Sequence, residues 1–225
     1  MSLLAYAVAE RDAGLIDGVG LDERPLVGIE HDGLALVVSQ HEYPLPEPTA
    51  KLLWRYEEVV ERLMGSQPIL PARFGSVLAD EDEAVTALRT RQDELRRGLA
   101  RVRGAVELGV RGDWTQPPAE QRGGTGTEYL LGQLDARRRA QRCADALDPL
   151  LALARDSSVK VLPRPSVPFI AAYLVDRDQV EEFSDLASQL SAEWRDGELV
   201  VTGPWPPYSF VEAPPFDRAP QGDAS

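Results

Sequence analysis

The side chains that most often perform acid–base or nucleophilic chemistry are scarce in this chain of 225 residues. It holds two histidines, His31 and His41, and one cysteine, Cys143. A hydrolytic site needs a nucleophile, a base and an orienting group within reach of one another, and a structural zinc site needs four ligands. His31 lies beside a predicted hairpin turn and His41 in a Pro-rich loop, so we expect both to be solvated or to cap a turn. Cys143 falls in a helical pattern and is expected to be a buried thiol. We predict no catalytic residue, no metal and no cofactor.

Two further stretches contain residue types that bind ions or phosphate. Residues 80–83 (DEDE) fit the acidic first turn of a helix, where carboxylates complement the helix dipole. Residues 123–130 (GGTGTEYL) precede a helix, whose free backbone N–H groups are suited to a phosphate. This stretch lacks the lysine of a P-loop, so we favour a flexible loop that ends in a threonine cap.

The net charge of −13 argues against nucleic acid and anionic lipid as partners. The only dense basic run is ARRRAQR, at 136–142. On a helix, its three consecutive arginines point about 100° apart. We favour a solvated outer face for this run, with a docking site for an acidic partner as the alternative.

No apolar stretch approaches the roughly 18 residues that span a bilayer, and the first residues lack the basic region of a signal peptide. We expect a cytoplasmic protein.

The stretch PARFG (71–75) is a candidate for protein contact. A proline and a glycine bracket Arg73 and Phe74, and strand alternation sends these two side chains to opposite sides. We expect Phe74 in the core and Arg73 outside, or in an ion pair across a domain boundary. A contact with a partner protein is the alternative.

The stretch GPWPPYSFVE (203–212) is the second candidate. Its prolines end the preceding strand and fix an extended path, along which Trp205, Tyr208 and Phe210 occur. We favour a strap that seals the sheet edge or the domain junction. An exposed aromatic platform and a ligand for a proline-binding module remain open. The candidate structural or protein-binding residues are therefore Arg73, Phe74, Trp205, Tyr208 and Phe210.

The elements that must position these residues follow from periodicity. The first half predicts a strand over 3–9, a hairpin about Asp32-Gly33, an amphipathic helix from the N-cap Thr49 to Gly65, an edge strand near Pro71 and a polar helix over 80–97. The apolar face of the first helix is expected to hold Leu52, Leu53, Tyr56, Val59, Val60, Leu63 and Met64.

The second half predicts the order β-α-β-β-α-β between Val102 and Thr202. That is the split-βαβ order of ferredoxin-like domains. The stripe expected on its long first helix and the turn after it is Leu130, Leu134, Ala140, Ala144, Leu147 and Leu151. The first half fits the same order with a degenerate first helix. We therefore predict an α+β protein with antiparallel sheets: a modified ferredoxin-like domain over 1–100, a ferredoxin-like domain over 101–212 and a flexible tail over 213–225.

Several stretches resemble one family, the gas vesicle protein L/F (GvpL/GvpF) family. They are PILPARFGSVLADEDEAVTAL, RVRGAVELGVRGDW, GTEYLLGQL, FIAAYLVDRDQVEEFSDLASQL and TGPWPPYSFV. They occur in the order expected of the family and span the chain from its first strand to about Glu212. The last stretch is the most specific of them. The L and F branches resemble each other closely, and these stretches do not assign the chain to either.

The resemblance implies a non-enzymatic accessory protein of gas vesicle formation with two ferredoxin-like α+β domains. It implies the hydrophobic main shell protein and other gas vesicle accessory proteins as partners, and no cofactor. The alternative is a small-molecule enzyme or binding module on a ferredoxin-like scaffold, which would gather two or more titratable groups in one buried cleft. A Pro-rich signalling adaptor would need PWPPY exposed and mobile.

Overall fold

The computed structural model describes residues 1–11, 18–42, 47–114, 126–162, 167, 169–195 and 197–211. The described chain forms two compact units: residues 1–103 together with 206–211, and residues 104–205. The division between the two units after Arg103 lies close to the domain boundary expected near Ala100. The segment after Trp205, which we had assigned to the second domain, belongs instead to the first unit. The expected tail lies outside the described residues.

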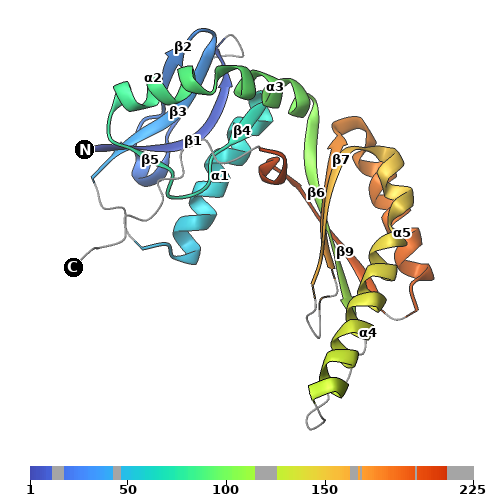
Figure 1. Ribbon diagram of the computed structural model, residues 1–225. Helices are drawn as coiled ribbons and strands as arrows, with labels where there is room; N and C mark the ends of the chain where they lie inside the picture. The colour runs from blue at the N-terminus through green and yellow to red at the C-terminus, as the bar shows by residue number, and fades with distance from the viewer. Residues whose placement is uncertain are drawn as a thin grey trace. The chain divides into compact units, whose positions relative to one another are not determined.

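The first unit is built on one antiparallel sheet in the order β2-β3-β1-β4, with β5 also paired to β1 (Figure 1). With β5 set aside, this is the strand order of a split βαβ sheet, and the short 3-10 helix η2 stands where the first helix would be. Its elements are β1 (Ser2–Glu10), η2 (Leu21–Glu23), β2 (Val27–His31), β3 (Leu34–His41), α1 (Ala50–Ser66), β4 (Ile69–Pro71), β5 (Val77–Leu78), α2 (Glu81–Thr90) and α3 (Gln92–Val102).

The central strand β1 is buried along nearly its whole length, which explains its uninterrupted apolar sequence. Helix α1 contributes Tyr56, Val59, Val60 and Leu63 to a core cluster that includes Leu4 and Tyr6 of β1. Helices α2 and α3 contact β2, β3, β4 and β1, and bury Leu88, Leu95 and Leu99.

Local signals in the first half are confirmed. Asp32 and Gly33 have φ of 44° and 77°, as a two-residue hairpin turn requires. Thr49 caps α1, because its side chain accepts a hydrogen bond from the Leu52 N–H at 3.2 Å. Asp80 accepts from the Glu83 N–H at 2.9 Å, and the Glu83 carboxylate accepts from the Ala79 N–H at 2.6 Å. The acidic run therefore forms a capping arrangement at the start of α2.

The second unit has an antiparallel sheet in the order β7-β8-β6-β9. With the order of elements along the chain, this is the predicted split-βαβ arrangement. The core cluster lies between the sheet and the helical elements α4, α5 and η3, which Figure 1 shows on one side of the strands. The elements are β6 (Ala105–Trp114), α4 (Gly126–Asp145), η3 (Asp148–Leu153), β7 (Ala154–Val161), β8 (Phe169–Asp176), η4 (Arg177–Gln179), α5 (Val180–Glu193) and β9 (Gly197–Trp205); η5 (Tyr208–Phe210) follows in the first unit.

Several expectations about elements were wrong. The predicted helix over 80–97 is two helices, because the backbone leaves the helical conformation at Arg91, with φ −114° and ψ 15°. Helix α1 continues through Gly65 to Ser66. Strand β9 does not end before Pro204, since Trp205 still pairs with Glu107 across a register shift.

The apolar stripe expected on α4 was also wrong in part. Ala140, Ala144 and Leu147 are buried as predicted, and the last two belong to the core cluster of the second unit. Three leucines of that stripe point to solvent instead: Leu130, Leu134 and Leu151.

Among the described residues, no helix is both long and apolar enough to cross a membrane.

Candidate protein-binding surface

A tyrosine of α1 joins two strands where the edge of the first sheet is interrupted. β4 pairs with residues 7–9 of β1 and β5 with residues 3–4, so the chain between β4 and β5 leaves the sheet edge. The Tyr56 hydroxyl lies in this interval and is 2.7 Å from the Ala5 carbonyl oxygen and 2.9 Å from that of Ala72. Phe74, in the departing loop, packs edge-on against the Tyr56 ring at 5.4 Å between centroids. The loop is thereby tied to α1.

The described residues after Trp205 pack on the first unit, and we call residues 206–211 the C-terminal strap. Pro206 and Pro207 are buried, and the Phe210 side chain is only 4% exposed. The Arg101 guanidinium of α3 lies 5.7 Å from the Phe210 ring centroid, in cation–π contact. The Tyr208 hydroxyl donates to the Glu57 carboxylate, at 3.1 and 3.0 Å from its two oxygens. Burial of both prolines is incompatible with PWPPY as an exposed, mobile ligand.

The five candidate residues do not form one cluster. Phe74 and Tyr208 both pack against the core cluster around α1, and Phe210 lies in the same unit. Arg73 is exposed, and its carbonyl oxygen accepts the Ser76 N–H at 3.1 Å, which closes the turn. Trp205 belongs to the second unit, where it is the last residue of β9 and 37% exposed.

The structure adds residues that were missed in the sequence. Trp54 of α1 is 65% exposed, and Leu53, which we had placed on the buried face, is 39% exposed. Glu57 lies three residues after Trp54 and four residues after Leu53, so it is a neighbour of both side chains on the helix surface. Its bond to Tyr208 brings the strap to the same place. We call Leu53, Trp54 and Tyr208 the α1 patch. The available signal was that Trp54 falls outside the stripe formed by Leu52, Tyr56 and Val59.

Burial affects the carboxyl group at the centre of this patch. Desolvation raises the pKa of Glu57; the hydrogen bond from Tyr208 opposes this shift, and the nearby Glu61 charge adds to it. The Tyr208 bond therefore stabilises the ionised form of a carboxyl group that burial would otherwise tend to neutralise.

A second buried polar cluster surrounds His41, which was wrongly expected in a loop. His41 is the last residue of β3 and is buried. Its Nε2 lies 2.8 Å from the Ser39 Oγ, which lies 2.8 Å from the Tyr6 hydroxyl. His41 Nδ1 is 3.9 Å from Asp22.

The residue types in this cluster are those of a Ser–His–Asp triad, but the serine is enclosed. Ser39 is 1% exposed, and a side-chain Cβ added at Gly20 would lie 3.0 Å from its Oγ. The Tyr6 hydroxyl is engaged too, since it accepts from the Leu21 N–H at 2.9 Å. A nucleophile must be reached by its substrate. We therefore interpret the cluster as a hydrogen-bond network that fixes η2 to the sheet.

This network predicts a pH dependence of stability. Burial lowers the pKa of His41 below its ordinary 6.5. The Arg24 charge adds to this downward shift of the pKa, and the Asp22 charge opposes it. As pH falls below 6.5, the unfolded chain therefore binds a proton that the folded chain resists, and the free energy of unfolding decreases. We expect the urea midpoint, followed by circular dichroism, to fall on acidification from about pH 7.5 to about pH 5.5, and His41→Gln to reduce this dependence.

Glu57 acts in the opposite direction and supplies the control. Because its pKa is raised, its stabilising contribution is present below 4.5 and is lost as pH rises through the raised value. Glu57→Gln should therefore make the acid-induced loss steeper. An unchanged pH dependence in His41→Gln would exclude His41 as its source.

Comparison with known proteins places these features in a family. The family model described as gas vesicle synthesis protein GvpL/GvpF matches residues 2–212. Gas vesicle protein L of Streptomyces sp. (strain CB03234) is 32% identical over 180 residues, which cover 69% of this chain and 67% of that protein. Gas vesicle protein F of Haloferax mediterranei is 29% identical over 218 residues, which cover 94% and 93%.

Solved structures show the same fold. The crystal structure of GvpF from Microcystis aeruginosa matches with a TM-score of 0.78 at 20% identity, over 94% of this chain and 99% of that chain. The GvpF structure from Anabaena sp. PCC7120 matches with a TM-score of 0.76 at 19% identity, over 94% and 98%.

Proposed function

Because the chain belongs to the GvpL/GvpF family of gas vesicle synthesis proteins, we propose that it is a non-enzymatic accessory protein of gas vesicle formation that binds the hydrophobic main shell protein. It acts in the cytoplasm and on the forming vesicle, together with other gas vesicle accessory proteins. By keeping the shell protein dispersed, it assists nucleation or growth of the vesicle wall.

The observation that supports a binding role is the α1 patch. Aromatic residues dominate protein interfaces when an exposed ring has a fixed position. Trp54 stands on a regular helix whose opposite face is held by the core, and Tyr208 is fixed by its bonds to Glu57. A subunit that polymerises through apolar strands is prone to aggregate before assembly. A preorganised apolar and aromatic surface can cover such a segment, and the acidic chain around it favours solubility.

Capture of the co-expressed shell protein tests this proposal. We expect the parent chain to retain the shell protein in pull-down and to raise its soluble fraction. Trp54→Ala should weaken the association by about 2 kcal/mol, roughly 30-fold, because a central tryptophan is a typical hot spot. Its high exposure predicts little change in fold stability, which thermal unfolding of the variant would verify.

Trp205→Ala is the matched control, because Trp205 is the other exposed tryptophan among the described residues. We expect it to retain the shell protein. If the Trp205 variant loses the shell protein and the Trp54 variant keeps it, the binding surface lies at the end of β9 and not on α1. If the parent chain neither binds nor solubilises the shell protein, the proposed function is wrong.

A further inference from the structure

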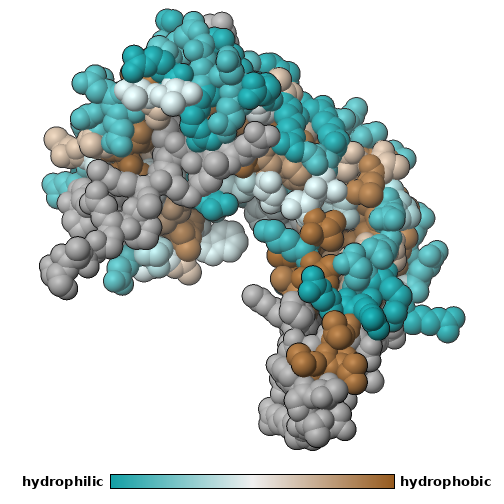
Figure 2. Space-filling view, viewed as in Figure 1, coloured by the Kyte–Doolittle hydropathy of each residue, from teal (hydrophilic) through white to brown (hydrophobic). Residues whose placement is uncertain are grey.

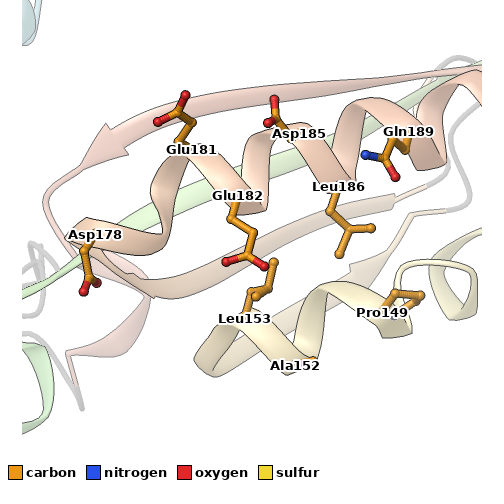
Figure 3. A pocket seen from close by; sticks show the side chains of 9 residues that line it. All are labelled: Pro149, Ala152, Leu153, Asp178, Glu181, Glu182, Asp185, Leu186 and Gln189. Carbon is orange, nitrogen blue, oxygen red and sulfur yellow. The ribbon is translucent and has the colours of Figure 1, made fainter.

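An acidic groove lies in the second unit, outside the α1 patch. It has a volume of about 640 Å³ and runs between η3 and α5. Figure 3 shows Glu182 and Leu186 pointing from α5 toward Leu153 of η3, while Glu181 and Asp185 lie along the other edge of α5. Leu153, Leu186 and nearby residues of η3 give the groove an apolar floor. Four carboxylates line it, and none of its described lining residues is basic.

The helix dipole accounts for only part of this charge. Glu181 and Glu182 lie in the first turn of α5, where carboxylates stabilise the helix. Asp185 lies beyond the first turn, where the dipole effect has fallen off, and still lines the groove. A groove with an apolar floor and an acidic border fits an amphipathic helix that carries basic residues.

The described chain presents such a helix face on α4. Leu130, Leu131 and Leu134 are each at least half exposed, and Arg137 and Arg142 follow them and are exposed. At about 100° per residue, these five positions fall within roughly 140° of the helix circumference, and so on one face. Figure 2 shows hydrophobic surface over one end of α4 and hydrophilic surface further along the helix. The three leucines lie near the start of α4 and are exposed, whereas Ala140 and Ala144, nearer its end, are buried.

We propose that the exposed face of α4 of one copy of this chain docks in the groove between η3 and α5 of a second copy. The dimensions agree. Residues 130–142 of α4 extend over about 18 Å, and residues 178–189 along the groove over about 17 Å at helical rise. Both surfaces are divided in the same way. Asp178 lies at one end of the groove, Glu182 lies near its middle beside Leu153, and Pro149 lies toward the other end (Figure 3). The arginines of α4 therefore meet the carboxylates when α4 runs antiparallel to the partner's α5.

A second copy is required because α4 cannot reach the groove of its own chain. Ala144 and Leu147 hold the end of α4 in the core, and the chain then enters η3, which is itself one wall of the groove. Turning the exposed face of α4 into that groove would expose those core residues.

Net charge opposes this association without preventing it. Two chains of charge −13 repel each other at long range. The Debye length is about 8 Å at physiological ionic strength, so distant charges are largely screened, while partly desolvated contact pairs are screened less. The association is therefore weak and depends on protein concentration. Salt alters the repulsion and the contact pairs together, so charge reversal is the clearer test.

Sedimentation velocity over a wide concentration range tests the contact. We expect the mass of the parent chain to rise above that of the 24.7 kDa monomer with concentration. Arg137→Glu with Arg142→Glu should weaken self-association roughly tenfold or more, and so should Glu182→Arg with Asp185→Arg, because each places like charges in contact. All four side chains are exposed, so both variants should fold. An equimolar mixture of the two variants should associate again, because each then supplies the surface that complements the other.

Arg111→Glu with Lys160→Glu is the matched control. It changes the net charge as much as the α4 variant does, but Arg111 and Lys160 lie on the sheet face opposite the helices, since both pair with Ile170 and not with the core-facing Phe169 or Ala171. We expect its self-association to equal that of the parent chain. The proposal is overturned if the parent stays monomeric at every concentration, if the groove and α4 variants associate like the control, or if their mixture stays monomeric. Trp54→Ala should leave self-association unchanged, which separates this contact from shell-protein binding.

Discussion

Phe210→Ala is expected to destabilise the first unit by about 3–5 kcal/mol, because it removes a fully packed aromatic side chain and leaves a cavity. Phe210 is 4% exposed and lies against Arg101, so its truncation removes buried apolar contacts. The loss also releases the strap, and with it the bond from Tyr208 to Glu57. Hydrogen exchange measured by mass spectrometry would follow the effect, with faster exchange expected in β1 and α1.

Strand β8 and the Trp205→Ala variant serve as internal controls for this experiment. β8 lies in the second unit, so its exchange should not change in Phe210→Ala. Trp205 precedes the strap and is partly exposed, so its replacement should leave exchange in β1 and α1 at the parent rate. If Phe210→Ala exchanged like the parent throughout, the strap would not belong to the core of the first unit.

Tyr56→Phe is expected to lower the free energy of unfolding by about 2 kcal/mol, although it removes a single oxygen atom. The hydroxyl lies within hydrogen-bonding distance of two backbone carbonyls at the interruption between β4 and β5. Burial raises the pKa of Tyr56 well above 10.0, so the hydroxyl remains a donor at any moderate pH. Without it, buried carbonyls lose a donor that water cannot easily replace, which costs about 1–3 kcal/mol. Urea unfolding at neutral pH would measure the change.

Tyr208→Phe is the matched comparison, since it also removes one tyrosine hydroxyl near α1. Tyr208 is only half-buried, and its acceptor is the carboxylate of Glu57, which water can solvate once the hydroxyl is gone. The expected loss is therefore smaller, at about 1 kcal/mol or less. Equal losses in the two variants would show that the Tyr56 bonds at the sheet edge add no special stability.

Features set by neighbouring residues could be predicted from the sequence. The Thr49 cap, the Asp32-Gly33 turn and the acidic start of α2 each depend on groups within four positions, and all are present. The βαββαβ order of the second unit was also correct, because alternating and helical periodicities differ clearly there. Periodicity does not give the width of a buried face, however, so Leu53, Leu130, Leu134 and Leu151 were wrongly assigned to cores.

The surface candidates depended on contacts between residues far apart in the chain. The aromatic content of the C-terminal stretch marked it as important, and a packed strap was expected. Nothing local indicated that Tyr208 would meet Glu57, which is 151 positions away, or that Trp205 would lie in a different unit from Phe210. His41 was misplaced for a related reason: β3 continues further than the Pro-rich sequence after it suggests, and burial follows from pairing with Ser2.

The strap also sets the order in which the protein can fold during its synthesis. Domains generally fold as units during translation, with the N-terminal domain first. Here the first unit lacks part of its packing until Phe210 has left the ribosome, whereas residues 104–205 of the second unit are contiguous and emerge earlier. The second unit can therefore finish folding before the first. A nascent chain that stops short of residue 210 carries an incompletely packed first unit, so a fully stabilised α1 patch is presented only by chains that ribosomes have translated past residue 210.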